Sequence, residues 1–145
     1  MVNNRYLLLI PLCLGAFVIS LVIAPYHING DQVYYTKAYS SLKGTDILSG
    51  RRIYLTHIFS YEYVHFLVVW LFSNLGFNKI IAMSVLNSVL TAFFTLFLME
   101  KTRNYLLILL LVVTNVYLYT MFFTLEKLKV GVIFLLMGII YKRNI

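Results

Sequence analysis

The chain has 145 residues, of which 61% are hydrophobic and 12% charged, and its mean hydropathy is +0.86. Soluble domains carry roughly 45–50% apolar and about 25% charged residues, so this composition excludes a water-facing globular domain and indicates an integral membrane protein. The formal net charge of +7 does not indicate a nucleic-acid partner. The basic residues lie between apolar runs, where they set topology and meet lipid headgroups or anionic lipid-linked substrates.

The first apolar run, residues 6–24, comes after the basic Arg5 and predicts an uncleaved signal-anchor helix. A run of ~19 residues reaches ~28 Å, close to the ~30 Å thickness of a bilayer core. Pro25 is expected to end this helix, because its ring cannot continue one. The single cysteine, Cys13, lies inside the run and is interpreted as a packed thiol. A chain with one cysteine cannot form an intramolecular disulfide or a metal site built from cysteines.

A polar stretch, residues 25–60, separates the first two predicted spans. Within it, residues 31–42 predict an interfacial amphipathic helix, and Gly44 and Gly50 are expected to break the chain after this helix. The basic start of the chain favours a cytoplasmic amino terminus, which would place this stretch outside the cell. The basic residues of the stretch itself instead favour the cytoplasmic side. We expect the outside, because cations that bind an anionic substrate are a poor topology signal. These cations are Lys37, Lys43, Arg51 and Arg52.

The remaining apolar runs predict further spans, with a tight turn at 73–78 and a charged connection at 100–104. The last run is long enough to cross only if it begins near Leu125 and takes its first charges towards the membrane. The sequence therefore predicts an all-α, polytopic transmembrane helix bundle of four to five spans in a single membrane domain, 1–145. The expected spans are residues 6–24, 60–75, 80–99, 105–123 and 125–141.

Many of the tyrosines gather in and beside the polar stretch. They form either an aromatic belt at the membrane interface or a platform on which sugar rings stack, and both interpretations stay open. Tyr34, Tyr35 and Tyr39 are the candidates for contact with a sugar. The gathered tyrosines are Tyr26, Tyr34, Tyr35, Tyr39, Tyr54, Tyr61 and Tyr63.

Asp31 lies just beyond the first span, where a carboxylate can accept a proton from a substrate hydroxyl near the membrane surface. The alternative is a helix cap, because Asp is a favoured N-cap residue. Arg51 and Arg52 are adjacent, and their guanidinium groups suit either a pyrophosphate or lipid headgroups.

Glu62 and His65 have the Glu-x-x-His spacing of di-iron bundles, but such a site needs a second copy and two further carboxylates. The chain has five acidic residues in all, so no metal site is expected. Glu62 is instead a second acid–base candidate. No Walker loop, dinucleotide fingerprint, nucleophile elbow or zincin motif is present, and no cofactor is expected.

Glu126, Lys127 and Lys129 lie where the last helix would enter the membrane. Ionisable groups at membrane depth usually face a cavity or pair with one another. Glu126 and Lys129 are three residues apart and can pair on one helix face. An ordinary loop between two spans is the alternative interpretation.

Three short segments appear in a familiar order. Gly30-Asp31 with Tyr34, Tyr35 and Tyr39 comes after the first span, Tyr61-Glu62-Tyr63 opens the second, and the sequence LEKLK at 125–129 opens a later one. This order resembles the amino-terminal part of the Wzy/EpsG-type polysaccharide polymerases. The family commonly has an arginine where this chain has Glu126, Lys127 and Lys129. The resemblance covers nearly the whole chain but about a third of a typical member, which predicts a truncated or short form.

The resemblance implies a bacterial inner-membrane enzyme that polymerises oligosaccharide repeat units carried on undecaprenyl pyrophosphate. It implies Asp31 or Glu62 as the base and Arg51, Arg52 and Lys129 as pyrophosphate contacts. Other envelope polysaccharide assembly proteins would be its partners. Two alternatives stay open: a glycosyltransferase that uses a polyprenyl-phosphate monosaccharide, and a non-catalytic small membrane subunit of an envelope complex.

Overall fold

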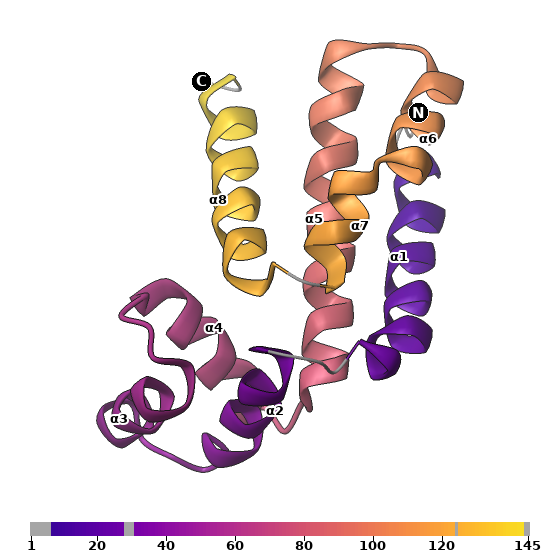
Figure 1. Ribbon diagram of the computed structural model, residues 1–145. Coiled ribbons are helices and arrows are strands. Elements are labelled where there is room, and N and C mark those ends of the chain that lie inside the picture. The colour runs from indigo at the N-terminus through magenta and orange to yellow at the C-terminus, as the bar shows by residue number, and fades with distance from the viewer. Residues whose placement is uncertain (1–6, 28–30, 124, 144–145) are drawn as a thin grey trace. The chain divides into compact units, whose positions relative to one another are not determined.

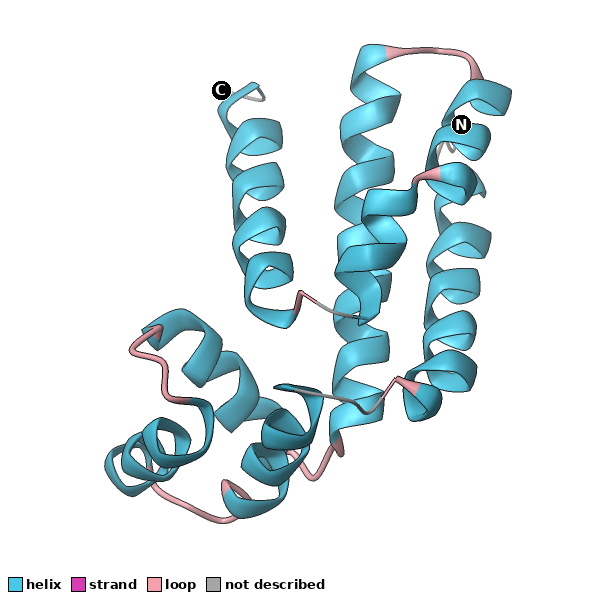
Figure 2. Cartoon of the chain, in the orientation of Figure 1, coloured by secondary structure: helices cyan, strands magenta, loops and turns pink. Residues whose placement is uncertain are grey.

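The computed structural model describes residues 7–27, 31–123 and 125–143, and every regular element in these ranges is a helix (Figures 1 and 2). This confirms the all-α prediction. Arg5 and Gly30, on which part of the prediction rests, lie outside the described residues. The helices are α1 (Leu9–Ile23), η2 (Ala24–Tyr26), α2 (Asp31–Ser41), α3 (Ile47–Ile58), α4 (Tyr63–Asn74), α5 (Lys79–Lys101), α6 (Tyr105–Thr114), α7 (Val116–Phe123) and α8 (Glu126–Arg143).

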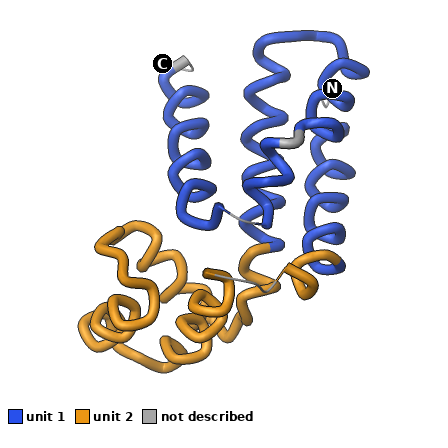
Figure 3. The backbone as a smooth tube through the Cα atoms, in the orientation of Figure 1, with its two compact units in different colours: residues 1–22, 84–145 blue, residues 23–83 orange. Residues whose placement is uncertain are grey.

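The chain forms two compact units, which are coloured separately in Figure 3. Residues 23–83 make one unit, with α2, α3, α4 and the first turn of α5. Residues 1–22 and 84–145 make the other, with α1, most of α5 and the three later helices. The polar stretch of the sequence thus belongs to one unit and most of the apolar runs to the other.

Two helices of the described chain are long and apolar enough to cross a membrane. They are Leu9–Tyr26, with 18 residues, and Lys79–Lys101, with 23 residues. The number rises to as many as four if each of two bent helix pairs counts as one span. Pro25 lies in the 3-10 turn η2, so the α-helix ends at Ile23, one residue before the predicted end.

The predicted polar loop, residues 25–60, holds two helices. The helix expected at 31–42 is confirmed as α2, and Gly44 takes a left-handed conformation with φ +74°, as a break requires. The prediction for Gly50 was wrong, because this residue lies inside α3. The Asp46 side chain accepts hydrogen bonds from the amides of Leu48 and Ser49 and so begins that helix despite the glycine.

Gly50 allows α3 and α4 to approach closely. A Cβ at this position would lie 2.9 Å from Trp70 Cδ1 and 2.9 Å from Thr45 Oγ1. The Trp70 indole N–H donates to the Thr45 carbonyl at 2.9 Å, so both neighbours are held in place. Only glycine leaves room for this contact.

The α3–α4 pair is bent by 109° at residues 59–62. Phe59 ends α3 in a left-handed conformation with φ 52°, which reverses the chain direction there. The helix expected within residues 60–75 is present as α4, but it has 12 residues. At 1.5 Å per residue it reaches about 18 Å, less than the ~30 Å of a bilayer core.

The predicted fourth span, residues 105–123, is two helices with a 48° bend between them. Asn115 makes the break without proline or glycine. Its backbone is extended, with φ −75° and ψ 98°, and its side-chain oxygen accepts a hydrogen bond from the Leu118 amide at 3.0 Å. The same residue therefore ends α6 and caps α7.

The core of the 23–83 unit lies between α2 and the α3–α4 pair. Tyr35, Ala38, Tyr39 and Leu42 are buried at the spacing of one helix face, against Tyr54, Phe66 and Val69. Each large apolar side chain buried in this way contributes roughly 1.5–3 kcal/mol. The Ser73 hydroxyl also donates to the Tyr39 carbonyl at 2.5 Å, which fixes α4 against α2.

The turn expected at 73–78 is confirmed between α4 and α5. Gly76 has φ +84°, the Phe77 amide donates to the Phe72 carbonyl at 3.0 Å, and the Asn78 side chain accepts from the Ile81 amide at 2.9 Å. These bonds satisfy backbone groups at both helix ends.

In the other unit, polar side chains connect α1 to α5. Asn87 Nδ2 donates to Ser20 Oγ at 2.8 Å, and Ser88 Oγ donates to the Cys13 carbonyl at 3.0 Å. Membrane helices commonly associate through such small and polar residues, because lipid offers no hydrophobic driving force between them.

Candidate functional site

The two candidate bases both lie at the start of a helix in the 23–83 unit. Asp31 is the first residue of α2, and Glu62 immediately precedes α4 as its N-cap residue. Both side chains are exposed. The Glu62 side chain makes no capping hydrogen bond, so its carboxylate is not committed to the helix it precedes. Either carboxylate is therefore accessible to a hydroxyl-bearing substrate.

Arg51 contacts the loop that carries Glu62. Its Nη2 donates to the Tyr61 carbonyl at 2.7 Å, and its Nη1 lies 3.4 Å from the Glu62 carbonyl. The guanidinium carbon is also 5.3 Å from the ring centre of Phe66 and 5.5 Å from that of Tyr63. Such cation–π contacts fix the position of a cation without consuming its N–H donors. The structure therefore fixes the Arg51 guanidinium against the backbone of the loop that carries Glu62, across the α3–α4 bend.

Arg52, the neighbour of Arg51, points elsewhere on α3 and is exposed. Successive residues on a helix do not share a face, so the two guanidinium groups leave α3 in different directions. Arg52 remains accessible to an anion at the surface of this unit.

The three candidate tyrosines of α2 have different environments. Tyr34 is half exposed, whereas Tyr35 and Tyr39 are buried. The Tyr35 ring packs edge-on against the His65 ring, with 5.5 Å between their centres. Of these three, only Tyr34 presents a ring surface on which a sugar could stack.

A buried Tyr54–His65 contact lies behind the Arg51 loop. The Tyr54 hydroxyl and His65 Nδ1 are 2.6 Å apart, and both residues are buried. In the sequence, His65 is notable only for its spacing from Glu62. In the folded unit, His65 turns into the core while Glu62 is exposed. Their separation of three residues could not reveal this, because the partner of His65 comes from another helix.

Lys79, at the start of α5, is also buried, and its Nζ donates to the Gln32 carbonyl at 2.9 Å. This bond ties α2 to α5 within the unit. Among the described residues, no three His, Cys, Asp or Glu side chains gather as metal ligands would.

Glu126 and Lys129 belong to the other unit, in the first turn of α8, and both are buried. Lys129 Nζ donates to the Phe122 carbonyl at 3.1 Å, and Asn87 Nδ2 donates to the same oxygen at 3.2 Å. A cation near the last carbonyls of a helix is stabilised by the helix dipole. Lys129 therefore has a structural partner at the end of α7.

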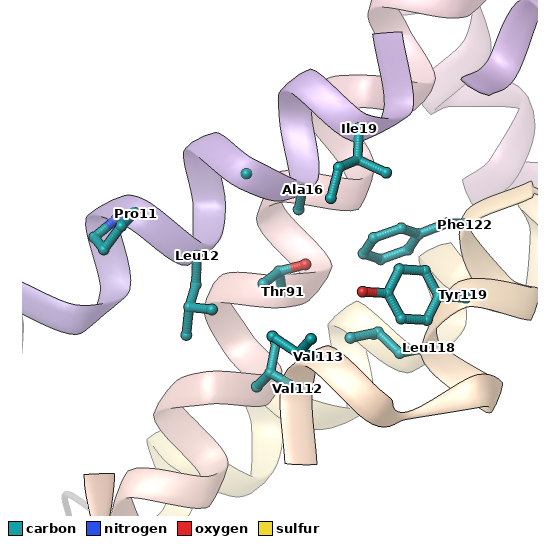
Figure 4. Close-up of a pocket in the computed structure, with 11 residues that line it drawn as sticks. Pro11, Leu12, Ala16, Ile19, Thr91, Val112, Val113, Leu118, Tyr119 and Phe122 are labelled. Carbon is teal, nitrogen blue, oxygen red and sulfur yellow. The ribbon is translucent and has the colours of Figure 1, made fainter. Parts of the chain in front are cut away.

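The same unit contains an apolar pocket of about 100 Å³ between α1, α5, α6 and α7 (Figure 4). Leu12 and Ala16 of α1 face it on one side, and Val112 and Leu118 face it on another. No sequence pattern indicated this pocket, because its walls come from four helices, of which α1 is distant in sequence from the other three.

In the described residues every regular element is a helix, two of these helices are long and apolar enough to cross a membrane, and the polar stretch that separates the two in sequence is itself helical. No family model, curated protein or solved structure matches the chain.

Proposed function

We propose that this chain is a multi-pass protein of the bacterial inner membrane that transfers glycosyl groups between lipid-linked oligosaccharides. In this proposal it polymerises undecaprenyl-pyrophosphate-linked repeat units into surface polysaccharide. The observation that carries the proposal is the contact of the Arg51 guanidinium with the backbone carbonyls of Tyr61 and Glu62 at the α3–α4 bend. A guanidinium fixed to the loop that carries an exposed carboxylate suits a reaction that needs a base and a contact for a leaving pyrophosphate.

The chemistry assigns separate tasks to these groups. Glu62 or Asp31 takes the proton of the acceptor sugar's hydroxyl as its oxygen bonds to the anomeric carbon of the donor. The bond from that carbon to the pyrophosphate oxygen breaks, and the lipid pyrophosphate leaves with the electron pair. Arg51 and the exposed Arg52 stabilise its charge. Arg51 uses one N–H on each of two nitrogens for backbone carbonyls, so further donors remain.

The same proposal includes four to five membrane crossings. α1 and α5 are two of them, the α6–α7 pair and α8 supply two more, and the α3–α4 pair is the fifth if it crosses. α8 has 18 residues and so reaches about 27 Å, close to the thickness of a bilayer core. Its Glu126 and Lys129 are buried rather than facing lipid, and Lys129 Nζ donates to the Phe122 carbonyl.

The direct test is polymerisation of a radiolabelled lipid-linked oligosaccharide by membranes that contain the chain. Glu62→Gln and Asp31→Asn are compared with Asp46→Asn, which changes an exposed carboxylate that caps α3. We expect the variant of the true base to lose about 10²–10⁴-fold in rate and the Asp46 variant to keep it. Full activity in both candidate variants would falsify the assignment of the base.

The choice of donor distinguishes this proposal from a polyprenyl-phosphate-dependent glycosyltransferase. That enzyme would accept a single lipid-linked sugar, whereas a polymerase needs the complete repeat unit. Incorporation from the monosaccharide donor alone would move the function to the former class.

A non-catalytic subunit of an envelope complex is the second candidate, and the surface of α1 favours it. Leu14, Val18 and Val22 recur every four residues and are exposed, which leaves an apolar stripe for a partner helix. This function predicts co-purification with larger polysaccharide assembly proteins and no effect of Asp31 or Glu62 substitutions on polymer length.

A further inference from the structure

The apolar pocket of about 100 Å³ lies entirely within one compact unit. α1 contributes Leu12, Gly15 and Ala16 to its wall, and Thr91 of α5 lies at its base (Figure 4). Val113 lines it from α6, and its side chain is half exposed at the outer surface of the unit. The pocket thus connects an exposed apolar surface to a buried position on α5.

The pocket lies beside the bend of the α6–α7 pair, and both of these helices line it. A continuous helix over residues 105–123 would carry its side chains in one straight row. The 48° bend at Asn115 instead turns α7 away from the line of α6. The Asn115 side-chain oxygen accepts a hydrogen bond from the Leu118 amide, and this bond fixes the bend beside the pocket.

The chemistry of the wall selects an apolar occupant. Thr91 is the polar side chain at the base, and its hydroxyl already donates to the Asn87 carbonyl at 2.8 Å. The Tyr119 hydroxyl points towards Thr91 and leaves the rest of the wall to hydrocarbon groups (Figure 4). An apolar cavity of ~150 Å³ stays free of water and accepts a small hydrocarbon, so a pocket of this size suits a short hydrocarbon segment.

We infer that this pocket binds the end of a membrane lipid's hydrocarbon chain, which enters beside Val113 and reaches Thr91. Two of the four helices that line the pocket, α1 and α5, are long and apolar enough to cross a membrane unaided, so the surrounding medium is lipid. A lipid chain is the apolar molecule present there at high concentration. The inference does not depend on glycosyl transfer and holds equally for a non-catalytic protein.

The chain offers a matched pair of positions for the test. Thr91 and Thr95 lie one turn apart on α5 and are both buried, but only Thr91 lines the pocket. A lipid chain can therefore reach Thr91 only by entering the pocket. Gly15 and Gly138 are matched as well, because a Cβ at either position has no heavy atom within 4 Å, and only Gly15 lines the pocket.

The experiment places the full chain in phospholipid nanodiscs with a phosphatidylethanolamine that carries a diazirine near its acyl chain end. After photolysis, peptide mass spectrometry measures labelling at Thr91 and Thr95. We expect labelling at Thr91 and none at Thr95. Gly15→Leu should lower labelling at Thr91 by about tenfold, because the leucine side chain excludes about two methylenes of the ligand from the pocket, and Gly138→Leu should leave it unchanged.

Val113→Phe narrows the pocket from α6 and serves as an independent variant if Gly15→Leu does not fold, as judged by circular dichroism and gel filtration. Equal labelling of Thr91 and Thr95, or labelling of Thr91 that neither variant reduces, overturns the inference.

Competition then identifies the source of the chain. Unlabelled farnesyl phosphate displaces the label if the pocket prefers an isoprenoid, and a short-chain phosphatidylglycerol displaces it if the pocket prefers an acyl chain. Displacement by both identifies a site for any lipid chain. If neither competitor reduces the label at Thr91, the labelling does not come from a saturable site and the inference is overturned.

Discussion

At the scale of single residues, the polar side chains of this protein mostly satisfy backbone carbonyls. Arg51 donates to Tyr61, Lys79 to Gln32 and Lys129 to Phe122. Each bond provides a buried or half-buried cation with an acceptor, which lowers the cost of removing its charge from water. These cations therefore have structural roles that any test of substrate binding must separate from catalysis.

The Tyr54–His65 contact should be a large single-residue contribution to stability. Tyr54→Phe removes a hydroxyl that lies 2.6 Å from a buried ring nitrogen, and an unsatisfied buried group costs roughly 1–3 kcal/mol. We expect this loss in the free energy of unfolding, measured by denaturant titration with the fluorescence of Trp70. Tyr61→Phe is the control, because Tyr61 is 85% exposed. Equal effects of the two changes would contradict this account.

Asp46 should make the stability of the 23–83 unit depend on acid pH. The Ser49 hydroxyl, followed by the Ser49 and Leu48 amides, lowers the pKa of Asp46 below its ordinary value of 3.8. A lowered pKa in the folded state means that the ionised cap stabilises the fold above pH 3.8 and that this contribution disappears as the pH falls through the lowered pKa.

Unfolding midpoints measured from about pH 5 down to about pH 2.5 should show this loss. Asp46→Asn keeps a cap acceptor but removes its titration, so part of the acid dependence should vanish. An unchanged pH profile in that variant would assign the effect to other carboxylates.

At the scale of elements, three helices in this chain begin at a residue whose side chain accepts hydrogen bonds from free backbone amides. Asp46 begins α3, Asn104 begins α6, and Asn115 separates α6 from α7. Each side-chain oxygen replaces a missing helical hydrogen bond. The bend at Asn115 lies beside the lipid pocket, whereas the bend that carries the Arg51–Glu62 contact comes from the left-handed conformation of Phe59.

Gly50 shows that contact between elements depends on a missing side chain. Gly50→Ala places a Cβ 2.9 Å from the fixed Trp70 ring, and this overpacking should cost about 1–3 kcal/mol of stability. The higher helix propensity of alanine returns at most about 1 kcal/mol. Gly131→Ala in α8 is the control, because its Cβ meets nothing within 4 Å, and it should be neutral or stabilising. Thermal unfolding monitored at Trp70 distinguishes the two results.

At the scale of the whole molecule, the two compact units share α5 and divide the candidate residues between them. Asp31, Glu62, Arg51 and Arg52 belong to residues 23–83, whereas Glu126 and Lys129 belong to the other unit. Whether the α3–α4 pair crosses the membrane decides on which side of it each of these candidate residues lies.

Cysteine accessibility can decide between four and five crossings. Lys37→Cys, Leu75→Cys and Arg103→Cys are made in a Cys13→Ser background and treated with a membrane-impermeant thiol reagent on intact cells. Each arm of the α3–α4 pair reaches about 18 Å, so we expect the pair not to cross. Positions 37 and 75 should then label from outside, and position 103 only after the cells are opened.

Labelling at 37 and 103, with protection at 75, would instead show that the α3–α4 pair crosses and give five spans. Protection at 37 in intact cells would place the polar unit inside. In that case the proposed polymerisation of lipid-linked glycans on the outer face could not use Asp31 or Glu62.

The sequence by itself determined the helical class, the helix at 31–42, the long helix around residues 80–99 and the turn at 73–78. Composition, apolar run length and local turn residues are properties of neighbouring amino acids, and they act before any long-range contact forms. The sequence also identified Glu62 and Arg51 as candidate site residues, although nothing in their spacing indicated that they meet.

Only the tertiary structure decided which side chains are buried and where the apolar runs bend. Tyr34 and Tyr35 are adjacent, yet one is exposed and the other packs on His65, because α4 covers one face of α2. Gly50 lies within a helix, where its missing side chain leaves room for Trp70, and the lipid pocket is walled by four helices beside the bend at Asn115. Each of these features depends on a partner distant in sequence, which local patterns cannot specify.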